Sequence, residues 1–201
     1  QREHLVIVWR SGEHLLRFIQ ALLDLARLEQ GPAAATAYAI RPTVNPVSEL
    51  CDALERQIRP DPTDTVRMAL AVDPALDRAA EWWLDVPRLA AVVVSLAGLI
   101  LDRLESGEVS IELAPGAAPE GEPIPLRIDI GLRAEMSTGD PADQRYLVRA
   151  ITRYVESEDP RSAPSGSVGT ALALAERVIA AHDGRFDVTP REVECGWPRF
   201  V

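Results

Sequence analysis

The sequence holds few of the residues that most often carry catalysis or bind metal ions. Its 201 residues include three histidines and two cysteines, Cys51 and Cys195. These cysteines lie far apart and lack the spacing of a metal site, so we expect reduced thiols rather than a disulfide. The sequence also lacks a nucleophile elbow, and we therefore expect no catalytic triad and no metal site built from these residues.

Positive charge and long apolar runs are scarce as well. Arg and Lys number 21 against 31 Asp and Glu, a formal net charge of -10 at pH 7. This balance argues against contact with nucleic acid or with anionic membranes. The longest apolar run, Leu89 to Leu101, is shorter than the about 20 residues that span a bilayer, so we expect a buried helix there. The N-terminus is charged and amphipathic and shows no signal peptide.

Residues 2–30 have the pattern of one long amphipathic helix that ends at Gly31-Pro32. Because a lone helix cannot bury its own apolar stripe, it must pack against a partner helix, from an upstream segment, a second chain or both. The chain begins inside this helical pattern and stops inside a strand-like one, so we expect a fragment of a longer protein. The residues expected in the bundle are Leu5, Val8, Leu15, Phe18, Ile19 and Leu22.

Beyond residue 32 the sequence alternates between helical and strand patterns. This order predicts an α/β fold, a sandwich of helices on a sheet. We expect Asn45 to cap a helix that Pro46 opens, and we expect Trp82 and Trp83 to be one core and one rim residue rather than a ligand site. The predicted helices are 47–58, 89–104 and 141–156; the predicted strands are 38–41, 66–72, 82–84, 109–111, 126–130, 184–188 and a closing segment that ends at Phe200.

A small-residue loop that opens a helix is the most informative stretch. Gly166 and Gly169 punctuate the loop, apolar residues then recur at helical spacing, and Asp183-Gly184 ends the helix. The first backbone N–H groups of a helix have no partner inside it, so such a loop can bind an anion. Most loops of this kind, however, only begin a helix.

This stretch resembles the second glycine box of the histidine-kinase ATPase domain. That box reads Gly-x-Gly-Leu-Gly-Leu and opens a helix that ends near Glu-Ala-His-Gly-Gly. Ser167 and Ala171 replace two of its glycines. The residues in register with the pattern are Gly169, Leu172, Ala173, Ala181, His182, Gly184 and Arg185.

Two further stretches resemble the same family. Residues 11–31 are similar to the second helix of its dimerisation and phosphoacceptor hairpin, and residues 85–89, Asp-Val-Pro-Arg-Leu, to the start of its ATP-binding helix. The resemblance implies a long N-terminal dimerisation helix, residues 1–31, followed by an α/β sandwich of the GHKL (Bergerat) type, residues 32–201. The family's phosphoacceptor box, His-Glu/Asp-Leu-Arg-x-Pro, does not follow His4 or His14, so we expect the acceptor upstream.

The resemblance also locates a nucleotide site whose ligand positions have changed. The family's helix carries Asn-Leu-x-x-Asn-Ala, in which the second Asn holds Mg²⁺; Ser95 and Leu99 stand at these two positions, with Asp102 one turn away. Glu135 and Gly139 stand in the box whose Asp binds adenine. Thr170 follows the eroded glycine box at Ser167 and Gly169. Three altered boxes imply a degenerate domain, although Glu135 and Gly169 leave open a weakened adenine site without magnesium.

The resemblance implies two-component signalling in the bacterial cytoplasm, for which we hold three hypotheses. In the first, a homodimer that needs no cofactor relays phosphoryl groups and docks a response-regulator receiver domain. In the second, the chain belongs to an active sensor histidine kinase with a divergent site that still binds ATP and Mg²⁺. In the third, it is a pseudokinase that only transmits conformation. Each fits the cytoplasmic part of a longer sensor protein.

Overall fold

The computed structural model describes a two-layer domain and isolated positions of two further helical segments. The continuous ranges are residues 40–58, 65–118, 123–132, 138–139, 167–190 and 198–200, and the isolated helical positions are 12, 15, 16, 19, 23, 26, 142, 146, 147, 149 and 150. In chain order the elements are β1 (Thr43–Pro46), α3 (Val47–Gln57), β2 (Val66–Val72), β3 (Glu81–Leu84), α4 (Val86–Leu101), β4 (Leu104–Pro115), β5 (Leu126–Leu132), β6 (Thr138–Gly139), α6 (Ser167–Ala180), β7 (Val188–Pro190) and β8 (Pro198–Phe200).

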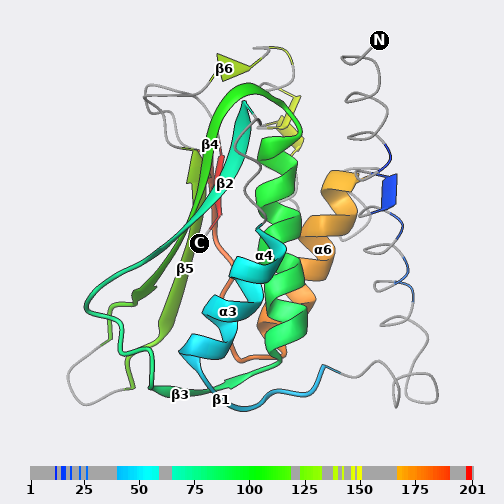
Figure 1. Ribbon diagram of the computed structural model, residues 1–201. Coiled ribbons are helices and arrows are strands. Elements are labelled where there is room, and N and C mark those ends of the chain that lie inside the picture. The colour runs from blue at the N-terminus through cyan, green and yellow to red at the C-terminus, as the bar shows by residue number, and fades with distance from the viewer. Residues whose placement is uncertain are drawn as a thin grey trace.

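The main sheet has the order β2-β4-β5-β8-β7, with β6 paired to β4 off this path. The β2–β4 pair is parallel and the other pairs are antiparallel. Strands β1 and β3 form a separate two-stranded sheet. Helices α3, α4 and α6 lie side by side on one face of the main sheet (Figure 1). This arrangement confirms the predicted α/β fold.

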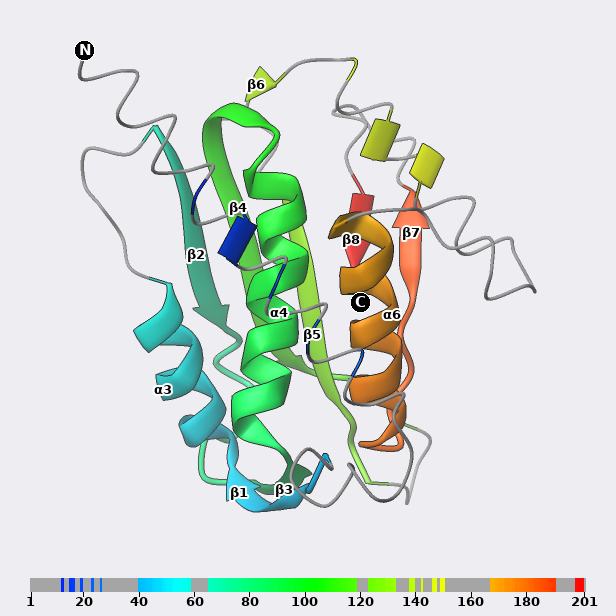
Figure 2. The same cartoon turned by 90° about the vertical axis from the view of Figure 1, so that its right-hand side faces the viewer.

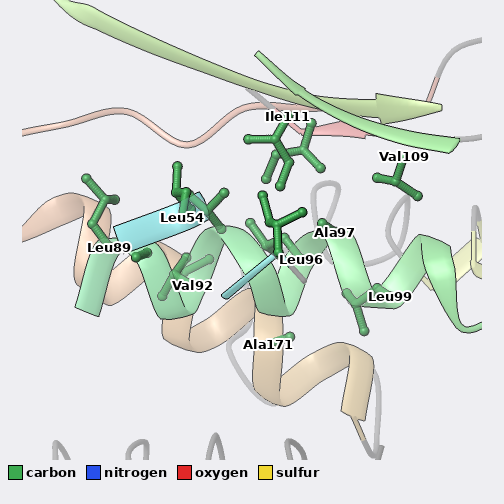
Figure 3. Close-up of a cluster of buried hydrophobic side chains, with 14 of the residues drawn as sticks. Leu54, Leu89, Val92, Leu96, Ala97, Leu99, Val109, Ile111 and Ala171 are labelled. Carbon is green, nitrogen blue, oxygen red and sulfur yellow. The ribbon is translucent and has the colours of Figure 1, made fainter. Parts of the chain in front are cut away.

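The core lies between the sheet and the three helices. Alternate residues of β4, among them Val109, Ile111 and Leu113, are fully buried and face the helix layer, as expected for a strand with one buried face. Helix α4 is apolar almost all round, which suits its central position between α3 and α6 (Figure 2). Leu96 and Ile111 meet in this core (Figure 3).

The central helix is shifted toward the N-terminus from its predicted bounds. It begins at Val86, because Asp85 accepts a hydrogen bond from the backbone N–H of Arg88 and Pro87 suits the first turn. It ends at Leu101, because Leu104 already begins β4. The predicted strand 109–111 is therefore the middle of a longer strand.

Two predicted strands lie elsewhere, and one predicted cap is wrong. Of the strand predicted at 38–41, residues 40 and 41 are not in a strand and residues 38 and 39 lie outside the described residues; β1 starts at Thr43. Asn45 belongs to this strand and caps no helix: its Nδ2 donates to the backbone oxygen of Leu84, 2.8 Å away. The strand expected from Gly184 starts only at Val188, because Asp183, with φ 54°, and Gly184 complete the turn that ends α6.

Other predictions are confirmed where the structure describes them. Strand β2 has its predicted bounds, and α3 ends one residue early, at Gln57. Trp82 is partly buried against the core while Trp83 is 69% exposed. Helical positions fall within the predicted helix 141–156, most of which lies outside the described residues. No helix in the described part of the chain is long and apolar enough to cross a membrane.

Candidate nucleotide site

Helices α4 and α6 run antiparallel, which brings the predicted nucleotide positions on these two helices to one end of the pair. At the other end, the Nε2 atom of His182, just after α6, accepts a hydrogen bond from the backbone N–H of Asp85, just before α4. The C-terminal half of α4 and the first turn of α6 therefore lie at the opposite end (Figures 1 and 2). Ser95 and Leu99 lie in α4 and Asp102 caps its C-terminal end, whereas Ser167, Gly169 and Thr170 lie in the first turn of α6.

Leu99 is a core residue. Its side chain is 4% exposed and lies on the side of α4 opposite to Ile111 (Figure 3). Magnesium binds hard oxygen ligands in near-octahedral geometry. A buried leucine has no side-chain oxygen, so this position offers packing to the α4–α6 layer and nothing to a metal ion.

The end of α4 carries a positive charge close to Leu99. The guanidinium of Arg103 donates from Nη1 to the backbone oxygen of Leu99. A cation there favourably caps the negative end of the helix, and it repels a second cation nearby. Asp102 is exposed, and its backbone N–H bonds to the oxygens of Gly98 and Ile100 as the helix cap. These residues do not fit a magnesium ion that bridges phosphates.

The predicted loop at residues 167–170 is helical. Because α6 begins at Ser167, Gly169 lies in its first turn and is buried, with Val168 1% and Leu172 0% exposed beside it. The backbone N–H groups of the first turn have no acceptor within the helix. Thr170 is half-buried, as is Ser95 on the facing helix.

The remaining predicted residues contribute less to a site. Glu135 lies outside the described residues, and Gly139 pairs with Leu104 through β6. Among the described residues, no group of three or more His, Cys, Asp or Glu side chains could hold a metal ion.

Cys51 is fully buried, and burial raises the pKa of its thiol, an effect that nearby Arg78 partly offsets. A buried neutral thiol is a poor nucleophile.

Two cavities lie at the end of the helix pair away from the predicted site. One, of about 460 Å³, is lined by residues of β1, α3 and the start of α4, including Arg41, Asp52 and Arg56. The other, of about 510 Å³, lies between α4, β5 and the segment that follows α6. Neither includes a predicted nucleotide-site residue.

The predicted bundle helix exposes apolar side chains in the single chain. Leu15 is 56% exposed and Ile19 44%, and their neighbours Leu16 and Leu23 are exposed by 57% and 44%. The other predicted bundle residues, Leu5, Val8, Phe18 and Leu22, lie outside the described residues.

Three residues at the helix ends have roles that the sequence did not predict. Asp85 caps the N-terminus of α4, His182 accepts a hydrogen bond from the backbone of Asp85, and Arg103 donates to the backbone oxygen of Leu99. An Asp just before a proline-containing first turn is a known signal for the start of a helix, so the sequence could have located the Asp85 cap. The roles of His182 and Arg103 depend on where their side chains lie in the fold.

Comparisons with known proteins find that this chain is similar in sequence to sensor histidine kinases, although no protein-family model matches it. The sensor histidine kinase AruS of Pseudomonas aeruginosa is 29% identical over 195 residues, which cover 94% of this chain and 18% of AruS. The autoinducer 2 sensor kinase/phosphatase LuxQ of Vibrio cholerae is 25% identical over 190 residues, 94% of this chain and 20% of LuxQ. The circadian input-output histidine kinase CikA of Thermosynechococcus vestitus is 28% identical over 198 residues, 96% of this chain and 24% of CikA.

Solved structures agree with the fold. Full-length ShkA in complex with AMPPNP superposes with a TM-score of 0.52 at 22% identity, over 100% of this chain and 37% of ShkA. A histidine kinase from Burkholderia phymatum gives 0.51 at 20% identity, over 96% of this chain and 94% of that one. These similarities confirm the predicted GHKL-type α/β fold. The chain spans 18% to 24% of the length of the curated relatives that it matches.

Proposed function

We propose that this chain, which is related to the sensor histidine kinases, belongs to a two-component signalling protein whose ATP site is eroded. It acts as a phosphotransferase or pseudokinase that docks a response-regulator receiver domain. The observation that carries this proposal is Leu99, a 4% exposed core side chain at the position where the resemblance expects a magnesium ligand. Phosphoryl relay through a histidine needs no ATP, so loss of this site is compatible with signalling.

The charge and packing around Leu99 support the same conclusion. Arg103 places its guanidinium on the Leu99 backbone oxygen, and Gly169 is buried in the first turn of α6. A bound nucleotide would need oxygen ligands for its metal and close approach of backbone to phosphate. Leu99 and Arg103 offer no oxygen ligand for the metal, whereas the fold itself is preserved.

Dimerisation through the N-terminal helix is the second part of the proposal. Leu15 and Ile19 are spaced by four residues, so they share one helix face, and both are about half exposed. Leu16 and Leu23 widen this apolar face. We propose that residues 1–31 form a homodimeric bundle with an upstream helix, and that residues 32–201 form the degenerate ATPase-like domain beside it.

Calorimetric titration of the chain with ATP, with and without Mg²⁺, tests the proposal. We expect no magnesium-dependent heat at protein concentrations that detect a dissociation constant of about 1 mM, near -4 kcal/mol. Full-length ShkA, whose crystal structure contains AMPPNP, is the positive control. Magnesium-dependent binding tighter than this limit contradicts the eroded site, while binding of ATP without magnesium identifies the weakened adenine site.

An active sensor kinase is the alternative function, and the names of the curated relatives favour it. They are kinases by name and align over at least 94% of this chain. This alternative predicts Mg-ATP binding and autophosphorylation once an upstream helix with a His-Glu/Asp-Leu-Arg-x-Pro box is present. A longer protein that lacks this box but folds and dimerises would instead be a pseudokinase.

A further inference from the structure

Strands β1 and β3 stop pairing close to the start of α4 (Figure 2). Their antiparallel register pairs Thr43 with Leu84, so the next pair along would be Pro42 with Asp85. Proline has no backbone N–H and cannot donate to a partner strand. Backbone pairing therefore ends at Thr43, and the residues just before it, 40–42, need another contact with the domain. We call these residues the entry segment.

The side chain of Asp85 supplies that contact. Its Oδ2 atom accepts a hydrogen bond of 3.0 Å from the backbone N–H of Arg41. Its Oδ1 atom accepts from the backbone N–H of Arg88 at 3.3 Å, and the Arg88 guanidinium lies 3.6 Å from Oδ2. This carboxylate side chain is only 13% exposed. It thus binds the entry segment and the first turn of α4 at the same time.

The backbone of Asp85 binds a third element. Its N–H donates to the Nε2 atom of His182, just after α6, at 2.7 Å. Its C=O accepts from the N–H of Leu89 in α4 at 2.9 Å. The N–H, the C=O and both carboxylate oxygens of Asp85 are therefore all in use. They join the entry segment, 44 residues earlier, to the end of α6, 97 residues later.

The bond from the Arg41 N–H fixes the backbone of the entry segment. Ile40 packs partly buried against the core, whereas Arg41 is exposed and lines the cavity of about 460 Å³. A movement of the chain at Arg41 must break the bond to Asp85 or turn the Asp85 side chain. The bonds of Asp85 to Arg88 and His182 oppose such a turn, so a displacement at Arg41 acts on both of them.

We propose that Asp85 is a relay that couples the entry segment to the end of α6. The bonds of Asp85 to Arg41 and to His182 form together and open together, because both depend on the position of one residue. This inference rests on the proposed function, in which residues 1–31 form the dimer bundle and the entry segment connects that bundle to the domain. It names the contact through which a movement of the bundle reaches α6.

Coupling between two contacts is reciprocal, so it is measurable from either side. Loss of the Arg41 bond weakens the His182 bond by the same factor by which loss of the His182 bond weakens the Arg41 bond. Two independent hydrogen bonds would each stabilise the fold without affecting the other. Reciprocity therefore separates a relay from a pair of purely structural contacts.

Amide hydrogen exchange of the 201-residue chain, followed by NMR, tests the relay with two matched variants. Arg41→Pro removes the backbone N–H that Asp85 accepts, while Arg41→Ala removes the side chain and keeps this N–H. The readout is the N–H of Asp85, which reports the bond to His182. The N–H of Asp102, bonded to the Gly98 oxygen at the other end of α4, is the internal control for overall stability.

We expect the Asp85 N–H to exchange at least tenfold faster in Arg41→Pro than in Arg41→Ala, beyond any change at the Asp102 N–H. In the reverse direction, His182→Ala should speed exchange of the Arg41 N–H by a comparable factor, again beyond the change at Asp102. The reverse measurement leaves Arg41 unaltered, so it tests the relay even if Arg41→Pro does not fold.

Two results would overturn the relay. The first is equal exchange of the Asp85 N–H in the two Arg41 variants. The second is a response of the Arg41 N–H to His182→Ala that is no larger than that of the Asp102 N–H, which would show only a loss of overall stability. Neither measurement involves ATP or self-association. Failure of the relay therefore leaves the proposed function standing, and magnesium-dependent ATP binding would contradict the eroded site without affecting the relay.

Discussion

His182 and Asp85 join the end of one core helix to the start of another. The Nε2 atom of His182 accepts a hydrogen bond of 2.7 Å from the backbone N–H of Asp85, 97 residues earlier in the chain. The Nδ1 atom lies 2.6 Å from the backbone oxygen of Val178 and donates to it. The two bonds together require the neutral imidazole with its proton on Nδ1.

Replacing this histidine removes the acceptor of a partly buried N–H group. We expect His182→Ala to lower the free energy of unfolding by about 1–3 kcal/mol, the cost of an unsatisfied buried donor. This corresponds to a fall in melting temperature of about 2–12 °C for a chain of this size. Thermal unfolding followed by circular dichroism measures the change.

The neighbouring Asp183 provides a matched control. It is exposed and adopts a left-handed backbone conformation, with φ 54°. Asn tolerates this conformation, so Asp183→Asn should change the free energy of unfolding by no more than about 0.5 kcal/mol. Equal losses in the two variants would show that the His182 bond contributes nothing of its own.

Asn45 is predicted to act as a hydrogen-bond donor. Its Nδ2 donates to the Leu84 oxygen at 2.8 Å and to two oxygens of Thr43 at 2.9 Å, which holds β1 to β3. A carboxylate cannot donate these bonds, so Asn45→Asp should cost about 1–3 kcal/mol of unfolding free energy.

The rank order of two Asn45 variants separates this role from helix capping. At a helix N-cap, Asp equals Asn and both exceed Ala. For a donor facing the Leu84 oxygen, Asn45→Asp is at least as damaging as Asn45→Ala, because the carboxylate also faces a carbonyl oxygen. Urea unfolding of the parent and the two variants distinguishes these roles. An Asn45→Asp variant as stable as the parent would support the role of Asn45 as a helix cap instead.

The case of Asn45 shows where the sequence was insufficient. By local sequence rules, an Asn-Pro pair before a helical pattern predicts that the Asn caps the helix. The hydrogen-bond partner of Asn45 is instead the backbone oxygen of Leu84, 39 residues later in the chain. Local periodicity was enough for β2 and for the apolar body of α4, because burial of one face leaves a pattern in the sequence. The ends of these elements depend on contacts that no local pattern records.

In the candidate site, too, the sequence predicted some positions correctly and missed others. The register of Arg88 and Leu89 was enough to place Leu99 on the central helix, where the structure has it. Gly169 was expected in a loop, and its helix begins earlier because Val168 and Leu172 are buried against the core. The contact of Arg103 with the Leu99 oxygen depends on one side-chain conformation, which the sequence does not specify.

Leu99 is predicted to serve packing rather than ligand binding. We expect Leu99→Ala to cost about 2–5 kcal/mol of unfolding free energy, since it opens a cavity at a 4% exposed position. Leu99→Met keeps the volume and should cost less than about 1.5 kcal/mol. Chemical denaturation measures both.

The variant Leu99→Asn tests whether the residue at this position alone prevents binding of ATP and magnesium. It restores the side-chain type expected for magnesium, yet Arg103 and the first turn of α6 stay as they are. We expect it to be at least as unstable as Leu99→Ala, because it buries an unsatisfied amide, and to gain no magnesium-dependent ATP binding. Such binding in the calorimeter would mean that one residue alone disabled the site.

Cys51 is predicted to be unreactive in the folded chain and to make stability depend on pH in the alkaline range. Burial raises the pKa of its thiol, so the folded state keeps the proton at a pH where the unfolded thiol, with a pKa of about 8.5, has lost it. Above that pH the unfolded state binds fewer protons than the folded state. The free energy of unfolding therefore falls as pH rises from about 8.5, and is unaffected by this group below it.

A comparison of Cys51 with Cys51→Ala, both carrying Cys195→Ser, isolates this effect. The sequence contains no lysine, so few groups other than Cys51 titrate between about pH 8 and 9.5. The parent should lose stability across this interval relative to Cys51→Ala, and its thiol should react with a disulfide reagent only after unfolding in urea. Parallel pH profiles together with rapid labelling of the folded chain would place Cys51 outside the core. A steeper loss in the parent, with a thiol that is protected until the chain unfolds, is the result expected for a cysteine that is buried in the hydrophobic core and has no role in the chemistry.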